Sequence, residues 1–204
     1  MPDPQGVAAG VTPEVRRRAV TLDEVKRDRE VEAYIAKADE YTGAIGYTEH
    51  GLRHANLVAS IASNILRLLG RAERAMQLAA MAGYLHDVGN LVGRVSHENT
   101  GALLAGGILA RLGMDPVERA IVMGAIGNHE EQTGEPVSEV GAALILADKS
   151  DVHRTRVRNP DPRTFDIHDR VNYAVEHSFL RVDDRANTVT LELTIDTGMS
   201  HVME

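Results

Sequence analysis

The sequence predicts a mainly α-helical bundle with a small β-hairpin at its C-terminal end. Apolar residues recur at helical spacing in successive segments up to about residue 157. Gly, Pro, Ser and Asp residues stand between these segments, where helices begin and end. Residues 188–196 instead alternate strictly between polar and apolar side chains, as a strand with one buried face does.

The helices can be placed in order from their end signals. Thr21 and Glu24 form a capping box that opens the first helix. Ser96 and Ser138 are expected to cap the fourth and sixth, and Asp115 before a proline opens the fifth. The predicted helices cover residues 21–40, 52–69, 72–86, 97–112, 116–130, 138–157 (at least to 148) and 169–179. Residues 179–182 are expected to pair with the strand at 188–196 across a turn at 183–187.

These elements divide the chain into three parts. Residues 1–20 are expected to be a flexible lead-in, because four of the first ten positions are Pro or Gly. Residues 21–160 form the predicted helical metal-binding domain, and residues 161–204 form an appendage of one helix and the hairpin. A hairpin alone is marginally stable in water, so it should dock on the helices or on a second subunit, and its strand edge suggests a homodimer contact.

Composition excludes several classes of function. The 204 residues carry a formal net charge of −8, which disfavours binding to duplex nucleic acid or to an anionic membrane. The absence of cysteine excludes disulfides, thiolate-bound metals and a thiol nucleophile. No apolar run is long enough to span a bilayer, and the N-terminus lacks the pattern of a signal peptide, so we expect a cytoplasmic protein.

Six polar residues are predicted to point into the bundle from apolar helix faces or helix ends: His54, His86, Asp87, His97, His129 and Asp148. A single histidine on an apolar face is more often satisfied by a backbone carbonyl than by a metal. A buried carboxylate such as that of Asp148, however, needs a cation or strong donors. Taken together, these side chains would satisfy one another through a metal ion.

The residue types narrow the choice of metal. Imidazole and carboxylate without thiolate favour iron or manganese and admit zinc, cobalt or nickel. Six candidate ligands exceed what one four-coordinate ion with an open position requires, and they suffice for two ions if one carboxylate bridges them.

At these residues the chain resembles the HD-domain superfamily of metal-dependent phosphohydrolases. The pattern of this family is a helical His, a later His-Asp pair and a distal helical Asp, which match His54, His86-Asp87 and Asp148. The resemblance extends over about residues 40–160. It implies an HD-type helical bundle with a metal site at these residues.

Two further histidines resemble those of the dinuclear branches of the superfamily. His97 and His129 fall where these branches place ligands of a second metal, so the resemblance implies two divalent ions bridged by Asp87. The HD-GYP cyclic-dinucleotide phosphodiesterases have the most similar pattern. The chain departs from them at Asn90, where they carry Lys, and at residues 134–136, where Gly-Glu-Pro replaces Gly-Tyr-Pro. These departures weaken the expectation that cyclic di-GMP is the substrate.

The function implied by the resemblance is hydrolysis of a phosphomonoester or phosphodiester, such as a nucleotide or another small phosphorylated substrate. A metal-bound hydroxide would attack phosphorus. Asp87 is the expected bridging ligand, and Lys149 is either a phosphate anchor or a surface lysine. Glu130 is either an orienting partner of a ligand histidine or an ordinary exposed residue, and His50 is expected to be structural or superficial.

A strip of arginines beyond the site also has two interpretations. Either the strip recognises a polyphosphate or nucleotide, or its side chains are solvated at a helix end. Its members are Arg154, Arg156, Arg158 and Arg163.

Two alternative functions remain open at this point. The same ligands resemble those of the HD-fold di-iron oxygenases of small polyols or phosphonates. The second alternative is a non-catalytic module that senses a small molecule. The complete set of predicted metal-binding residues argues against it, because a site that has lost its activity usually lacks one of them. Hydrolysis is the commoner use of the fold, which is an argument by analogy.

Overall fold

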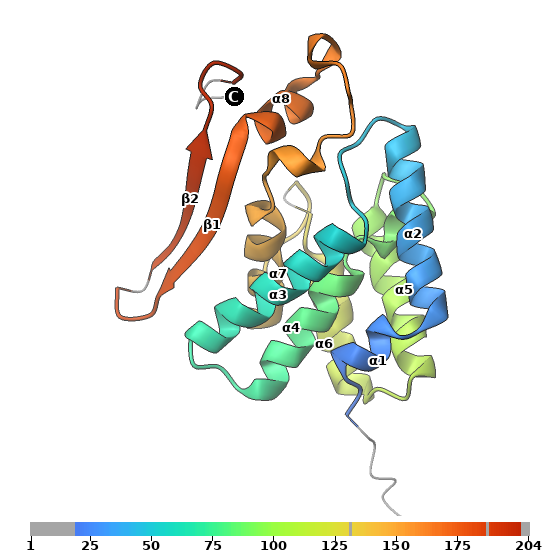
Figure 1. The fold of residues 1–204 in the computed structure, drawn as a ribbon. Helices are drawn as coiled ribbons and strands as arrows, with labels where there is room; N and C mark the ends of the chain where they lie inside the picture. Colours follow the sequence, from blue (N-terminus) through green and yellow to red (C-terminus); the bar gives the residue numbers. More distant parts are fainter. Residues whose placement is uncertain (1–18, 131, 187, 201–204) are drawn as a thin grey trace, which may run out of the picture.

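A computed structural model describes residues 19–130, 132–186 and 188–200, and it confirms the predicted fold class: a helical bundle with a two-stranded antiparallel hairpin (Figure 1). The α-helices are α1 (Leu22–Lys26), α2 (Arg29–Ala44), α3 (Leu52–Leu68), α4 (Glu73–Leu85), α5 (His97–Arg111), α6 (Pro116–Gly127), α7 (Glu139–Ser150) and α8 (Ile167–Ala174). Short 3-10 turns are η1 (Val88–Leu91), η2 (Arg154–Arg156) and η3 (Pro162–Thr164). The strands are β1 (Val175–Asp183) and β2 (Thr188–Ile195).

Helices α3 and α4 lie against one another in the middle of the bundle (Figure 1). Their close approach depends on Gly83, because a Cβ atom there would lie 2.9 Å from the backbone of Ala59. Gly83 stands three residues before His86, so this contact brings the end of α4 beside α3.

The chain after α4 lies just as closely on α5. A Cβ atom on Gly89 in η1 would lie 1.9 Å from the carbonyl oxygen of His97 and 2.5 Å from the amide nitrogen of Gly101. Only glycine permits this approach. It holds the segment that follows His86 against the first turn of α5.

The interior of the bundle is formed mainly by aliphatic side chains from α3 to α7. The largest of those that are almost completely buried are Leu66, Met81, Leu85, Leu109, Ile126 and Leu144. Among the helices that the structure describes, none is long and apolar enough to cross a lipid bilayer.

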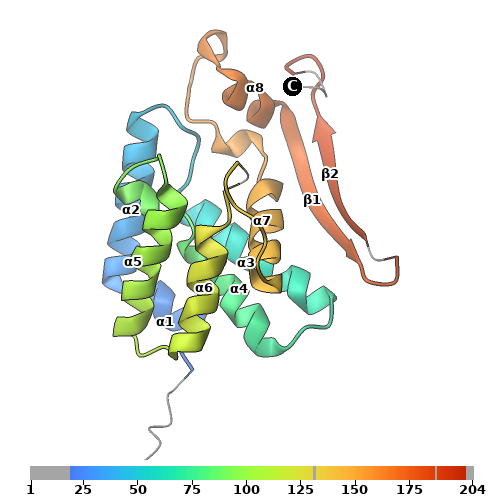
Figure 2. The same ribbon diagram turned by 180° about the vertical axis from the view of Figure 1, so that it is seen from behind.

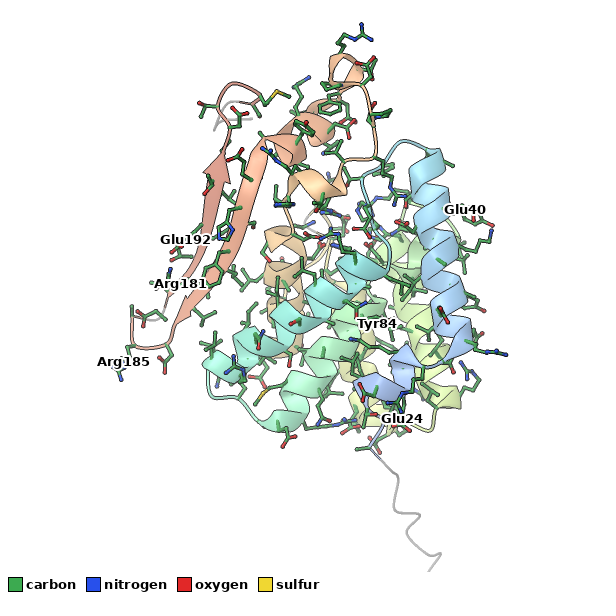
Figure 3. The ribbon with its side chains drawn as sticks, viewed as in Figure 1. Glu24, Glu40, Tyr84, Arg181, Arg185 and Glu192 are labelled. Atoms are coloured by element: carbon green, nitrogen blue, oxygen red, sulfur yellow. The ribbon has the colours of Figure 1, made fainter. Side chains whose placement is uncertain are left out.

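The hairpin lies along one side of the bundle, with β1 nearer the helices and β2 outside it (Figures 1 and 2). Leu180 and Val182 of β1 pack against the core. Their cross-strand partners Leu191 and Val189 remain 39% exposed, so the apolar side of β2 is not covered by the described chain. On the opposite side of the hairpin, Arg181 and Glu192 form an ion pair at 2.7 Å (Figure 3).

The predicted helix over residues 169–179 is wrong in its second half. Helix α8 ends at Ala174, and the chain continues as β1 from Val175. Pairing with β2, in the register Asp183↔Thr188, takes these residues into a strand. The predicted hairpin and its turn are therefore confirmed, although β1 is longer than expected.

The boundaries of the early helices differ in two places. The capping box of Thr21 and Glu24 is present, and Figure 3 labels Glu24 at the start of α1. The first predicted helix is interrupted, because the Asp28 side chain accepts hydrogen bonds from Glu30 and Val31 and starts α2 there. Ser96 precedes α5 but does not cap it: its φ is 58° and its side chain makes no capping hydrogen bond.

Two later helices are shorter than their longest predicted extents. Helix α6, capped by Asp115 as expected, ends at Gly127 rather than at residue 130. Helix α7, capped by Ser138, ends at Ser150, and residues 154–156 form the separate turn η2. The predicted lead-in falls almost wholly on residues 1–18, outside the described residues, and the division at residue 160 stays a prediction.

Candidate metal centre

All six predicted ligand residues converge at one place in the bundle. His54 comes from α3, His97 from the start of α5 and Asp148 from the last turn of α7. The His86-Asp87 pair directly follows α4, and His129 lies two residues beyond α6. The four histidines are at most 2% exposed, and Asp87 is 8% exposed. The tertiary packing therefore brings together residues that span nearly a hundred positions of the sequence.

One group of side chains surrounds a point between α3, α4 and α7. His54 Nε2 lies 3.2 Å from His86 Nε2 and 3.3 Å from Asp148 Oδ1. Asp87 Oδ2 lies 3.5 Å from His54 Nε2 and 3.3 Å from His86 Nε2. Atoms of His54, His86 and Asp148 lie within 4.8 Å of one another, close enough to hold one metal ion.

A second group lies on the other side of Asp87. Ligand atoms of His86, Asp87 and His129 also fall within 4.8 Å of one another. Asp87 Oδ1 is 3.5 Å from His97 Nε2, and the rings of His97 and His129 have centroids 5.1 Å apart. The two oxygens of Asp87 thus face different histidines. The ligand role of each of these residues stays a prediction.

The outward nitrogens of the four histidines are all held by hydrogen-bond acceptors. The contacts of Nδ1 are His54 to Asp151 Oδ2 at 2.7 Å, His86 to Gly83 O at 2.8 Å, His97 to Arg94 O at 3.1 Å and His129 to Ile126 O at 2.6 Å. Because a carbonyl or carboxylate can only accept, each ring donates its Nδ1–H. In the neutral rings each Nε2 then carries a lone pair that points into the site.

This donor set fits a metal cation. Lone pairs on the inward nitrogens face carboxylate oxygens, which can also only accept hydrogen bonds. Asp87 Oδ2 is buried and has no hydrogen-bond partner among the described residues. Asn90 donates to Asp87 Oδ1 at 2.9 Å, and Arg94 Nη1 lies 3.1 Å from His97 Nε2, but the remaining acceptors repel one another unless protons or cations lie between them. Nitrogen and carboxylate ligands without sulfur match iron, manganese, zinc or cobalt.

Charge interactions in the protein without metal support the same conclusion. Burial lowers the pKa of His86, but the carboxylates of Asp87 and Asp148 outweigh burial and raise this pKa to about 10. Burial raises the pKa values of Asp87 and Asp148, yet nearby histidines hold both well below their usual range. A proton on His86 therefore supplies positive charge between these carboxylates, and metal binding would release it.

Asp151 is a candidate site residue that the sequence analysis missed. Its carboxylate is 1% exposed and fixes the ring of His54. Arg53 donates two hydrogen bonds to it, at 3.2 and 2.7 Å, and Arg156 lies 3.6 Å away. Such carboxylate–histidine pairs orient a ligand ring and raise its basicity. The sequence feature that could have identified Asp151 is its position three residues after the predicted ligand Asp148.

A cavity of about 170 Å³ opens onto the metal centre, and its wall is mostly polar. His50, which we expected to be structural or superficial, lines it, and Arg94 and Lys149 contribute positive charge. Val171 and Asn172 of α8 complete the wall, so the segment predicted as an appendage forms part of the site. Burial is the largest influence on His50 and lowers its pKa to about 4.

Lys149 and Glu130 both line this cavity. Lys149 Nζ lies 3.3 Å from Asp148 Oδ2, and the lysine side chain is 41% exposed. Glu130 Oε2 lies 3.9 Å from His97 Nε2 and 3.7 Å from the Arg94 guanidinium. These contacts place Glu130 beside a candidate ligand rather than among ordinary surface residues.

The predicted arginine strip is engaged within the protein. Arg154 pairs with Glu176, Arg158 with Asp39 and Arg163 with Asp161. Arg156 is 8% exposed and donates to the carbonyl oxygens of Glu49 and Asp151. The arrangement favours structural roles over recognition of a polyphosphate.

Comparison with known proteins identifies the class. The HD domain family model matches residues 47–153, which is more than half of the chain and contains all six predicted ligand residues. The chain therefore belongs to the HD-domain family.

Two individual proteins are also similar to this chain. An uncharacterized protein of Methanocaldococcus jannaschii is 26% identical over 206 aligned residues, which cover 89% of this chain and 79% of the relative. A crystal structure of a predicted HD superfamily hydrolase from an uncultured Thermotogales bacterium is 29% identical, with a TM-score of 0.48. That match covers 61% of this chain and 68% of the other.

Proposed function

We propose that this HD-domain protein is a metal-dependent phosphohydrolase with a dinuclear centre, acting on a small phosphorylated substrate. The observation that carries the proposal is the buried Asp87 carboxylate, whose two oxygens face different histidines and of which Oδ2 has no hydrogen-bond partner among the described residues. A carboxylate in this position would suit a site for two cations of the kind that two-metal hydrolases use.

The chain supplies the groups that hold and orient the reactants. His54, His86, Asp87 and Asp148 would hold one ion, and His97 and His129 would join Asp87 at the second. When bound, divalent ions lower the pKa of water and neutralise phosphoryl oxygens. Iron or manganese is the expected metal, since the donor set has no sulfur.

Lys149 would bind the substrate as a point charge at the rim of the cavity. Its ammonium group is 3.3 Å from Asp148 Oδ2, close enough to reach a phosphoryl oxygen beside that ligand.

The size and polarity of the cavity favour a small phosphoester that is held by its phosphoryl group. At about 170 Å³ the cavity is smaller than pockets of about 300–1,000 Å³ that enclose whole ligands. The phosphoryl group would lie inside, and the rest of a nucleotide-like substrate would extend to solvent.

The decisive experiment measures metal content and activity on the same anaerobically purified protein. Elemental analysis and EPR or Mössbauer spectroscopy give the number and oxidation state of the metals, and a panel of phosphomonoesters, nucleotides and cyclic dinucleotides tests hydrolysis. Two metals with phosphate release that is indifferent to oxygen would support the proposal. A mixed-valence di-iron signal without phosphate release would favour an oxygenase. One metal or none would overturn the second site.

A further inference from the structure

Arg94 lies in the loop between η1 and α5, and its guanidinium lines the cavity beside the candidate ligands. Nη1 lies 3.1 Å from His97 Nε2 and 3.4 Å from Asn90 Oδ1. The guanidinium also lies over the ring of Tyr47, 5.2 Å from its centroid. The side chain is 27% exposed, so the charge is partly screened from solvent but remains accessible from the cavity.

The shortest of these contacts cannot coexist with metal binding. His97 donates Nδ1–H to the carbonyl oxygen of Arg94, so its Nε2 carries one lone pair. In the structure that lone pair faces Nη1 of Arg94. If His97 binds a metal through Nε2, the same lone pair is used, and this guanidinium donor is released.

The carboxylates near Arg94 do not hold it tightly. Asp87 Oδ1 is 3.9 Å from Nη1, and Glu130 Oε2 is 3.7 Å from Nη2. Both distances exceed that of a hydrogen bond. Arg156, the other arginine that lines the cavity, instead donates to Glu49 O at 3.0 Å and Asp151 O at 2.7 Å.

We propose that Arg94 binds the phosphoryl group of the substrate once metal ions occupy the site. This inference rests on the proposed function and adds a specific substrate-binding residue to it. The planar fork of a guanidinium matches two phosphoryl oxygens, and its contact with the Tyr47 ring helps to hold the guanidinium at the cavity.

The backbone of the same residue holds His97. Between them, Ser96 has a φ of 58°, the one positive value outside glycine in the described residues. This left-handed turn folds the ring of His97 back onto the Arg94 carbonyl oxygen at 3.1 Å. Arg94 thus orients a candidate ligand through its carbonyl group and faces the substrate with its side chain, so a substitution of the side chain leaves the backbone contact available.

The test is calorimetric binding of inorganic phosphate to the metal-loaded protein, compared between wild type, Arg94→Gln, Arg94→Lys and the control Arg181→Gln. Arg181 is an exposed arginine of the hairpin, paired with Glu192. We expect Arg94→Gln to weaken phosphate binding about 10-fold or more, since charge-assisted hydrogen bonds are lost. Arg94→Lys should be intermediate, and Arg181→Gln should bind phosphate as wild type does.

Metal content of each sample separates the outcomes. Weaker phosphate binding by Arg94→Gln with wild-type metal content supports the proposal. Unchanged phosphate affinity in Arg94→Gln overturns it, and so does a loss of metal that parallels the loss of phosphate binding. Neither result bears on the proposed phosphohydrolase activity, which is judged from the wild type. If metal-loaded wild type neither binds phosphate nor hydrolyses any phosphoester, the proposed function fails and this inference fails with it.

Discussion

His54 Nε2 lies 3.2 Å from His86 Nε2. Each of these rings donates its Nδ1–H to an oxygen acceptor on its other side. Two neutral rings held in this way point lone pairs at one another. The packing of α3 on α4 at Gly83 fixes this distance, so the fold supports a site that is completed by a cation or a proton.

The two halves of the centre should respond differently to mutation. We expect Asp87→Ala to release both metal ions, because this carboxylate faces both groups of histidines. His129→Ala should mainly weaken the second ion. Elemental analysis after dialysis measures both effects, and two tightly held metals in Asp87→Ala would refute the bridging role.

Asp151 should tune metal affinity without binding the metal. Asp151→Asn keeps the shape of the side chain but removes the charge that orients His54. Loss of such a partner typically lowers metal affinity about 10–100-fold. Competition with a chromogenic chelator measures the change, with Asp161→Asn as a control on an exposed carboxylate paired to Arg163. Equal affinities in the two variants would show that Asp151 does not support the ligand.

The metal-free protein should lose stability as the pH rises. Burial lowers the pKa of His86, but the carboxylates of Asp87 and Asp148 outweigh burial and raise this pKa to about 10. The pKa of an unfolded histidine is about 6.5. Its contribution to stability is fully present below about pH 6.5 and disappears as the pH approaches 10. Burial lowers the pKa values of His50 and His97 to about 4. These two residues therefore change the free energy of unfolding only below about pH 6.5.

Urea denaturation of the chelator-treated protein at about pH 6.5 and 9.5 checks this prediction. The free energy of unfolding should be lower at the higher pH, and the difference should shrink in Asp148→Asn. Added Mn²⁺ should restore stability most at the higher pH, because protons compete less strongly with it for the ligand nitrogens there. A free energy of unfolding that does not fall between the two pH values would contradict the assignment.

The contact between η1 and α5 should tolerate no side chain. In Gly89→Ala the new Cβ would lie 1.9 Å from the carbonyl oxygen of His97, so we expect destabilisation of more than about 2 kcal/mol and weaker metal binding. Gly107→Ala on α5 meets no atom within 4 Å and should stabilise the helix by up to about 1 kcal/mol. Thermal unfolding compares the two. A Gly89→Ala protein as stable as wild type would show that η1 and α5 can move apart to accommodate the added methyl group.

The sequence by itself determined the fold class, most helix positions and the hairpin turn. Helical spacing placed His54 on the buried face of its helix, and the capping residues Asp115 and Ser138 start α6 and α7 as predicted. These features depend on neighbours within a few residues, which a sequence pattern contains. Ser96 was misjudged because its backbone is left-handed, with a φ of 58°, and its side chain makes no capping hydrogen bond, which the pattern of neighbouring residues did not indicate.

Only the tertiary structure decided what surrounds the ligands. Asp151 reaches His54 across 97 positions, and the α8 residues Val171 and Asn172 reach the cavity from a segment that the sequence assigned to an appendage. The strand at Val175 formed where the helical pattern continued, because pairing with β2 outweighed it. Contacts of this kind depend on how helices approach one another. That approach is set by packing at positions such as Gly83, whose effect appears only once its neighbour across the bundle is known.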